Sequence, residues 1–269
     1  MIRHLSILAI GFELSIGLGS AAAPASALTP LDDLLARAGQ QVARFWDQFS
    51  AVTCIETVEQ DKLSDDGKVL LKKRNAYDYL VLLQFSGDDL MVNESRVLQG
   101  KAAKESDRAL LSTSGFSTLV LIFHPRFHSS YLFTDQGSDP QMPLLRRVRF
   151  EHIRGRRSPS VLQLRSREYP IEWQGTAWMD SATGNITRIQ ASLKEPLEDV
   201  GLMRLDSEVR YSPVPLGGAK ELPWLPMAAQ IEADTRHQHW RNLHQFTAYR
   251  QFSVSTDSKT EAPTEVSKQ

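Results

Sequence analysis

A helical repeat of apolar residues marks the first structured part of the chain. Between residues 30 and 49 the apolar positions are Leu31, Leu34, Leu35, Ala38, Val42, Phe45, Trp46 and Phe49. Spacings of three and four place them on one face of a helix. Thr29, Pro30 and Asp32 supply a cap, a proline at the first position and an acid in the first turn. The pattern predicts an amphipathic helix that buries Phe45 and Trp46 against a sheet.

After Ser50 the pattern changes to one in which strands dominate. Residues 51–63 lead through the turn signal SDDG into residues 68–85. Further along, Met203, Leu205, Val209 and Tyr211 alternate with charged residues, followed by Met227, Ala229 and Ile231 on the same face. The alternation predicts about nine to ten mostly antiparallel strands with one solvated face.

One apolar run does not alternate. The stretch SGFSTLVLIFHPRF is densely apolar from Leu119 to Phe123 and is interrupted by Pro125. We expect a second, short helix packed into the core, since two apolar helices can cover the apolar face of the sheet. The fold class is therefore α+β.

The amino-terminal residues carry the features of an export signal. A short basic start is followed by an apolar run that Glu13 interrupts, and Ala25 and Ala27 form a small-residue cleavage pattern. The sequence predicts a signal peptide over residues 1–27 that is cleaved after Ala27, and hence a periplasmic or extracellular protein. It also predicts a single domain over residues 28–255 and a disordered tail over residues 256–269.

One predicted hairpin resembles a hairpin found in other secreted proteins. The stretch GTAWMDSATGNITRI, residues 175–189, resembles a G-x-x-W-x-D-x-x-T-G-x-x-x-R-I hairpin of uncharacterised secreted bacterial proteins. The layout is similar to the periplasmic lipoprotein-carrier superfamily, which sorts outer-membrane lipoproteins. That resemblance implies a half-barrel, in which helices close the concave face of a curved antiparallel sheet around a cavity for acyl chains. The hairpin residues themselves have the character of turn and packing residues.

The chemistry of the chain points away from an enzyme. The motifs G-x-S-x-G, H-E-x-x-H and G-x-x-x-x-G-K-[ST] are missing, although a scattered Ser-His-Asp triad stays open. Cys54 shares a strand face with apolar residues and is expected to be inert. His237 and His239 lack a third ligand at a characteristic spacing, so no metal and no cofactor are expected. A formal net charge of −1 does not favour nucleic acid as a partner.

Polar residues among inward-facing positions are candidates for ligand contact. Asn242 and His244 share the parity of Trp240 and Phe246, so each must be hydrogen-bonded or face a cavity. Together with Trp46 they form a candidate site for a hydrophobic, lipid-like or acyl-chain ligand in the concave face. The alternative is an envelope structural or adaptor protein whose core is filled by its own side chains. The oligomeric state stays open.

Arginines mark a second candidate surface. Arg147 and Arg149 alternate with apolar residues before the turn RGRRSPS, and Arg165 and Arg167 alternate after it. If these segments pair as a hairpin, the four arginines share one face and form a contact for an anionic membrane surface. The alternative is a solvated strand face that resists edge pairing.

Overall fold

The structure is a computed structural model that describes residues 30–87, 89–100, 114–164, 167–216 and 222–251. The predicted signal peptide and tail therefore lie outside the described residues. The elements are α1 (Pro30–Phe49), β1 (Val52–Leu63), β2 (Val69–Ser86), β3 (Asp89–Leu98), η2 (Phe116–Phe123), η3 (Pro125–Ser130), β4 (Tyr131–Ser138), β5 (Leu145–His152), β6 (Val161–Leu164), β7 (Arg167–Pro170), β8 (Trp173–Asp180), β9 (Ile186–Leu193), η4 (Glu198–Val200), β10 (Leu202–Pro213), β11 (Trp224–Thr235) and β12 (His239–Gln251).

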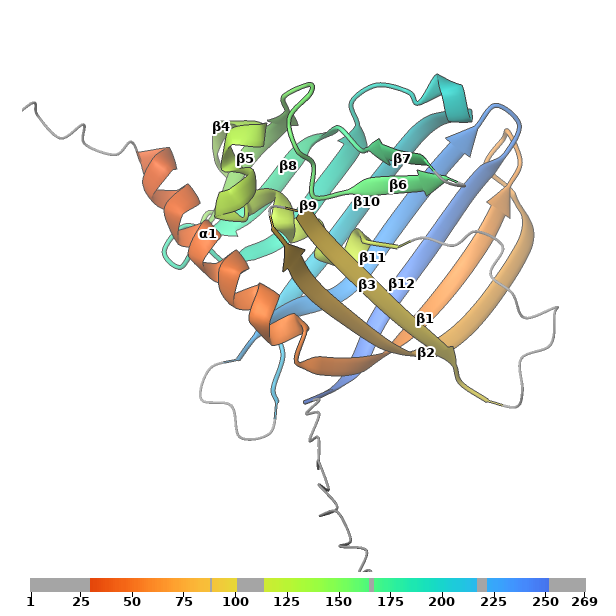
Figure 1. Cartoon of the computed structure of the whole chain (residues 1–269), viewed down its shortest axis with the longest axis horizontal. Helices are drawn as coiled ribbons and strands as arrows, with labels where there is room; N and C mark the ends of the chain where they lie inside the picture. Colours follow the sequence, from red (N-terminus) through yellow and green to blue (C-terminus); the bar gives the residue numbers. More distant parts are fainter. Residues whose placement is uncertain (1–29, 88, 101–113, 165–166, 217–221, 252–269) are drawn as a thin grey trace, which may run out of the picture.

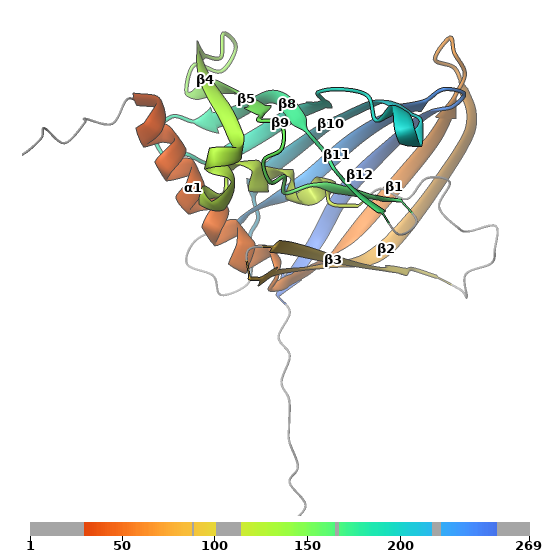
Figure 2. The same ribbon diagram turned by 45° about the horizontal axis from the view of Figure 1, so that its top comes forward.

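One large antiparallel sheet dominates the molecule (Figure 1). Its ten strands follow the order β3-β2-β1-β12-β11-β10-β9-β8-β5-β4. Among the described residues β3 and β4 do not pair with each other, so the sheet is open rather than a closed barrel. Figure 2 shows that it is strongly curved. The predicted antiparallel sheet is confirmed, and β6 and β7 form an additional two-stranded sheet.

Helix α1 begins and ends where the apolar stripe does. Leu34, Leu35, Ala38, Val42, Phe45 and Phe49 are buried, and the helix contacts η2, η3, β2 and β11. Trp46 is only half-buried, beside the ring of His124 at 6.0 Å between ring centroids. Phe45 is buried as expected, whereas Trp46, at the border of the stripe, is only partly buried and packs against the edge of the core.

The second apolar segment is helical and buried, but it is a 3-10 helix. Every residue from Ser117 to Phe123 in η2 is buried, and the segment contacts β9, β10 and β11 as well as α1. It follows Gly115, whose φ is +79°, and ends at His124, which is extended before Pro125. A residue that precedes proline is driven out of the helical region, which separates η2 from η3.

The β8–β9 hairpin docks its turn onto α1. The Asp180 carboxylate accepts hydrogen bonds from the backbone N–H groups of Ala182 and Thr183, at 3.1 and 2.7 Å, and from the Thr183 hydroxyl. Gly184 then adopts a φ of +76° and lies so close to α1 that a Cβ atom would come within 2.7 Å of the Ala38 nitrogen. The turn chemistry and the helix contact thus require the same glycine.

The other hairpin residues also have packing roles. The Arg188 guanidinium carbon lies 4.2 Å from the centroid of the Trp178 ring, a cation–π geometry. The Trp178 indole N–H donates to Asp139 at 2.8 Å. A Cβ atom at Gly175 would come within 1.9 Å of the Gln190 carbonyl oxygen. The residues that carry the sequence resemblance therefore hold the hairpin together.

Candidate functional site

The five candidate ligand residues do not form one site. Asn242, His244 and Phe246 lie together on β12 and are buried, which confirms their inward parity. The two tryptophans lie near opposite ends of β1. Trp240 is half-buried and pairs with Lys62 near the last residue of β1, whereas Trp46 lies on α1, which ends shortly before the first residue of β1. Ten residues of strand separate the two ends of β1, on the order of 33 Å. The structure therefore does not bring the two tryptophans together.

His244 belongs to a buried charged network. Its Nδ1 lies 2.7 Å from Oε1 of Glu56, a carboxylate that is 0% exposed. The Arg96 guanidinium donates to both oxygens of the same carboxylate, at 2.5 and 3.0 Å. Strands β12, β1 and β3 each contribute one of these side chains, so the network links three strands across the sheet.

The network continues from Arg96 to the start of η2. Arg96 also donates to Glu94 at 2.7 Å, and the other Glu94 oxygen accepts the backbone N–H of Gly115 at 2.7 Å. The guanidinium lies 4.9 Å from the centroid of the Tyr79 ring. The side chains that neutralise one another inside the sheet therefore also position the segment that enters η2.

Hydrogen bonds keep Glu56 ionised despite its burial. Burial alone raises the pKa of this carboxyl, but the hydrogen bonds from His244 and Arg96 outweigh it, so its pKa lies below the ordinary value. Burial raises the pKa of the Cys54 thiol to about 12, which keeps it protonated and unreactive. Both side chains are buried, with Glu56 0% and Cys54 4% exposed.

Glu56, Gln60 and Arg96 are residues that the sequence prediction missed. Glu56 and Gln60 share the parity of Cys54 on β1, and this signal was available in the alternation itself. The Gln60 amide donates to the Asn242 side-chain oxygen at 3.3 Å. Asn242 and His244 are therefore hydrogen-bonded core residues, one of the two alternatives that their parity left open.

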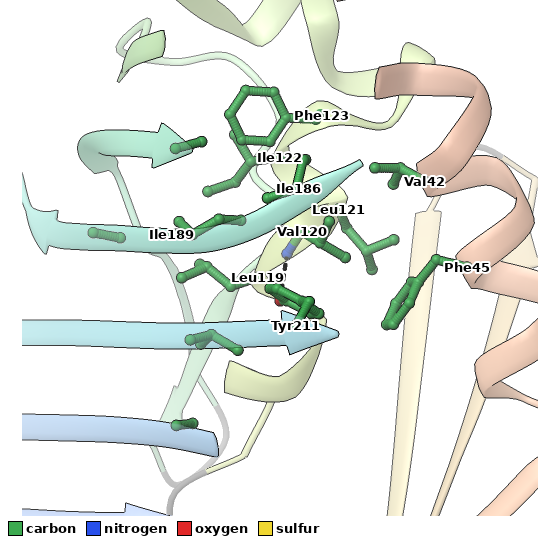
Figure 3. Close-up of a cluster of buried hydrophobic side chains, with 14 of the residues drawn as sticks. Val42, Phe45, Leu119, Val120, Leu121, Ile122, Phe123, Ile186, Ile189 and Tyr211 are labelled. Carbon is green, nitrogen blue, oxygen red and sulfur yellow. Dashed lines mark hydrogen bonds between the residues drawn. The ribbon is translucent and has the colours of Figure 1, made fainter. Parts of the chain in front are cut away.

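The space between α1 and the sheet is occupied by η2 (Figure 3). Leu119, Leu121, Ile122 and Phe123 are almost fully buried there. Two hydroxyls of the sheet satisfy the polar groups of the segment. Tyr211 accepts the N–H of Val120 at 3.1 Å and donates to the Ser117 carbonyl at 3.2 Å, and the Tyr79 hydroxyl lies 2.8 Å from the Ser117 hydroxyl.

The outward face of β8–β11 carries an open polar groove of about 420 Å³. Its lining includes Thr176, Gln190, Asp206, Glu208, Gln230 and Glu232. Arg204 bonds to Asp206 at 2.9 Å and to Glu232 at 3.3 Å, while Arg188 lies 3.2 Å from Glu208. These carboxylates are therefore already compensated within the protein.

The predicted arginine hairpin does not form. Strand β5 pairs with β4 and β8, which occupy both of its edges, while β6 pairs with β7 in a separate sheet. Arg147 and Arg149 do face away from the buried Val148 and Phe150, as the alternation predicts. Arg165 lies outside the described residues, as does the side chain of Arg167.

The part of the chain that the structure describes holds no group of three or more His, Cys, Asp or Glu side chains arranged to bind a metal ion. His239 lies between Asp234 and Asp65, at 3.0 and 3.2 Å. None of the helices described is long and apolar enough to span a membrane.

Comparisons with known proteins assign no family. No protein-family model matches the chain, and no curated protein matches it. Among solved structures, the chain is similar to a DUF1329 family protein from Desulfovibrio piger at 11% sequence identity. The match covers 87% of this chain and 98% of that chain, with a TM-score of 0.44. At this TM-score the likeness carries no conclusion about function.

Proposed function

We propose that this chain is an exported, non-enzymatic structural or adaptor protein of the bacterial envelope. In this proposal the sheet is a half-barrel whose concave face is covered by α1 and η2. The observation that supports it is the burial of Leu119, Leu121, Ile122 and Phe123 in the space where a carrier would hold its ligand. A filled interior leaves the outer surface of the sheet for the protein's interactions.

The state of the buried polar groups supports a non-enzymatic role. Glu56 accepts hydrogen bonds from Arg96 and His244 and has no exposed surface, so a substrate does not reach it. The Cys54 thiol is held in its protonated form. General bases and nucleophiles need access to the atoms on which they act, and these groups lack that access.

The competing hypothesis is a hydrophobic or lipid-like ligand inside the sheet. Such a ligand would have to displace η2, which the hydroxyls of Tyr79 and Tyr211 hold by hydrogen bonds. Organic extraction of the purified protein followed by mass spectrometry separates the two hypotheses. We expect no lipid in stoichiometric amount, and one bound acyl lipid per chain would overturn the proposal.

A cavity variant provides the matched control for this experiment. Leu121→Ala removes a fully buried side chain of η2, and an apolar cavity of that kind stays dry and binds small apolar molecules such as benzene. We expect benzene to raise the thermal unfolding midpoint of the variant and to leave that of the wild type unchanged. Equal stabilisation of both proteins would mean that the wild-type interior is already open.

Export is tested separately from the interior. Sequencing of the amino terminus of protein recovered from the envelope or the medium is expected to begin at Leu28, after the Ala25-Ser26-Ala27 pattern. Recovery from the cytoplasm with an intact Met1 terminus would contradict export and leave the filled interior unaffected.

A further inference from the structure

The tip of the β1–β2 hairpin extends past the neighbouring strand β3. β3 pairs with β2 only over Tyr77–Ser86, whereas β2 begins at Val69. Figures 1 and 2 both show this tip beside the β11–β12 hairpin, and Leu63 pairs with His239 at this end. Among the described residues, the first half of β2 is therefore paired on one edge only.

Three consecutive apolar side chains are exposed at this tip. Val69 is 44% exposed, Leu70 63% and Leu71 48%. Lys62 pairs with Leu71 and Leu63 pairs with Val69, so Leu70 is the extra residue of a β-bulge. Contiguous exposed apolar side chains on a soluble domain are typical of a contact surface rather than of an ordinary strand face.

An aromatic residue and several cations surround these apolar residues. The Lys62 ammonium lies 5.6 Å from the centroid of the half-buried Trp240 ring. The stretch KVLLKKR, residues 68–74, contains four cations and no acid. Two of these cations already have carboxylate partners at the protein surface, because the Lys72 ammonium lies 2.5 Å from Glu59 and the Lys68 ammonium 2.6 Å from Asp66, so lipid phosphates would have to replace those carboxylates. The two acids of the adjacent turn are engaged within the tip, Asp66 with Lys68 at 2.6 Å and Asp65 with His239 at 3.2 Å.

We propose that this tip docks on an anionic lipid bilayer. Val69, Leu70 and Leu71 enter the headgroup region, and the lysines extend their ammonium groups to the lipid phosphates. Lysine suits this role because its apolar stem follows the apolar surface while its charge stays in the polar layer. Tryptophan favours the same interface because its ring is amphipathic.

The charges favour a lipid surface over a protein partner. Lys72 and Lys73 lie on the part of β2 for which the described residues supply a neighbouring strand at one edge only, and lysine on an edge strand disfavours the addition of another strand. Lysine is also depleted at the cores of protein–protein interfaces. Clusters of lysine and arginine, by contrast, are attracted to anionic lipids.

Co-sedimentation of the purified mature protein with vesicles tests the proposal. One set of vesicles is made of phosphatidylcholine alone, which has no net charge. The other contains phosphatidylcholine and phosphatidylglycerol at a ratio of about 3:1, so that its surface is negative. We expect binding to the anionic vesicles that weakens in high salt, because added ions screen the attraction. The variant Val69→Ser/Leu70→Ser/Leu71→Ser is expected to bind at least about tenfold more weakly, in line with the apolar area that it loses.

Matched variants separate the tip from the rest of the surface. Leu132→Ser removes a leucine that is 61% exposed on β4, the other edge strand, and should bind like the wild type. The variant Arg147→Gln/Arg149→Gln should also bind like the wild type, because those side chains lie on β5. The single variant Leu70→Ser changes only the most exposed of the three apolar residues, so it tests the tip even if the triple variant misfolds. Thermal unfolding shows whether each variant is folded.

Three results would overturn the proposal. The first is a wild type that does not bind anionic vesicles, and the second is a folded triple variant that binds as well as the wild type. The third is a wild type that forms a dimer in solution through the same residues, which would make the tip a protein interface. Loss of vesicle binding only in the Arg147→Gln/Arg149→Gln variant would show that these two arginines, and not the tip, contact the anionic lipids.

Discussion

Gly184 offers a direct test of how the β8–β9 hairpin is held against the first helix. Gly184→Ala introduces two separate costs. The first is the left-handed backbone at φ +76°, which costs an alanine about 1–2 kcal/mol. The second is steric, because the new Cβ would lie within 2.7 Å of the Ala38 nitrogen and within 2.8 Å of Arg37 atoms. These are backbone and Cβ atoms of α1, which cannot shift without a cost in free energy.

A second glycine isolates the steric cost. Gly155 has the same φ of +76°, but a Cβ atom there would meet nothing within 4 Å. Both substitutions also reduce the conformational freedom of the unfolded chain by a similar amount, so this effect cancels between them. We expect Gly155→Ala to lower the free energy of unfolding by about 1–2 kcal/mol. Gly184→Ala should lower it by about 1–3 kcal/mol more, the usual range for overpacking.

Urea unfolding followed by tryptophan fluorescence measures both values. The hydrogen bonds from Arg37 to the Ser181 carbonyl and from Gln41 to the Thr183 carbonyl, each 3.2 Å, belong to the same contact. Gly184→Ala should therefore also increase amide hydrogen exchange in α1. Equal destabilisation by the two glycine variants, within about 0.5 kcal/mol, would refute the docking of the turn on the helix.

Two further predictions concern buried charge and acid stability. Arg96→Met leaves the carboxylates of Glu56 and Glu94 without their shared cation. It should lower the free energy of unfolding, measured in urea, by about 3–5 kcal/mol. A loss below about 1 kcal/mol would contradict the network. Burial lowers the pKa of both His124 and His128 below 6.5, so below that pH the unfolded chain binds more protons and stability falls. Unfolding of His124→Gln/His128→Gln should depend less on pH between 7 and 5, and an unchanged slope would contradict this origin.

The alternation in the sequence predicted strand faces correctly wherever the pairing is regular. Leu205, Val209 and Tyr211 are buried as expected. Met203 and Met227, which the same pattern placed inward, are exposed. Both lie at register shifts between β10 and β11, where a bulge turns the side chain to the other face. The local pattern contains no signal for such a bulge.

The buried network was harder to predict for a different reason. Parity places Glu56 on the inner face, but its partners come from β12 and from β3, which does not pair with β1 directly. Only the strand order and the register of β2 bring Arg96 to Glu56. Strand parity alone is enough to place a carboxylate at position 56 on the inner face, but tertiary pairing decides which donor it has.

Because the buried network of Glu56, His244 and Arg96 depends on strand register, it can in turn stabilise that register. A one-residue slip of β12 against β1 would turn His244 to the outer face and remove a hydrogen-bond partner from Glu56. We infer that the network fixes the register of a sheet that serves as a rigid support for its outer surface. A double-mutant cycle of Glu56→Gln and His244→Ala measures this in urea. We expect a coupling above about 1 kcal/mol, whereas additivity within about 0.3–0.5 kcal/mol would show that the two side chains act independently.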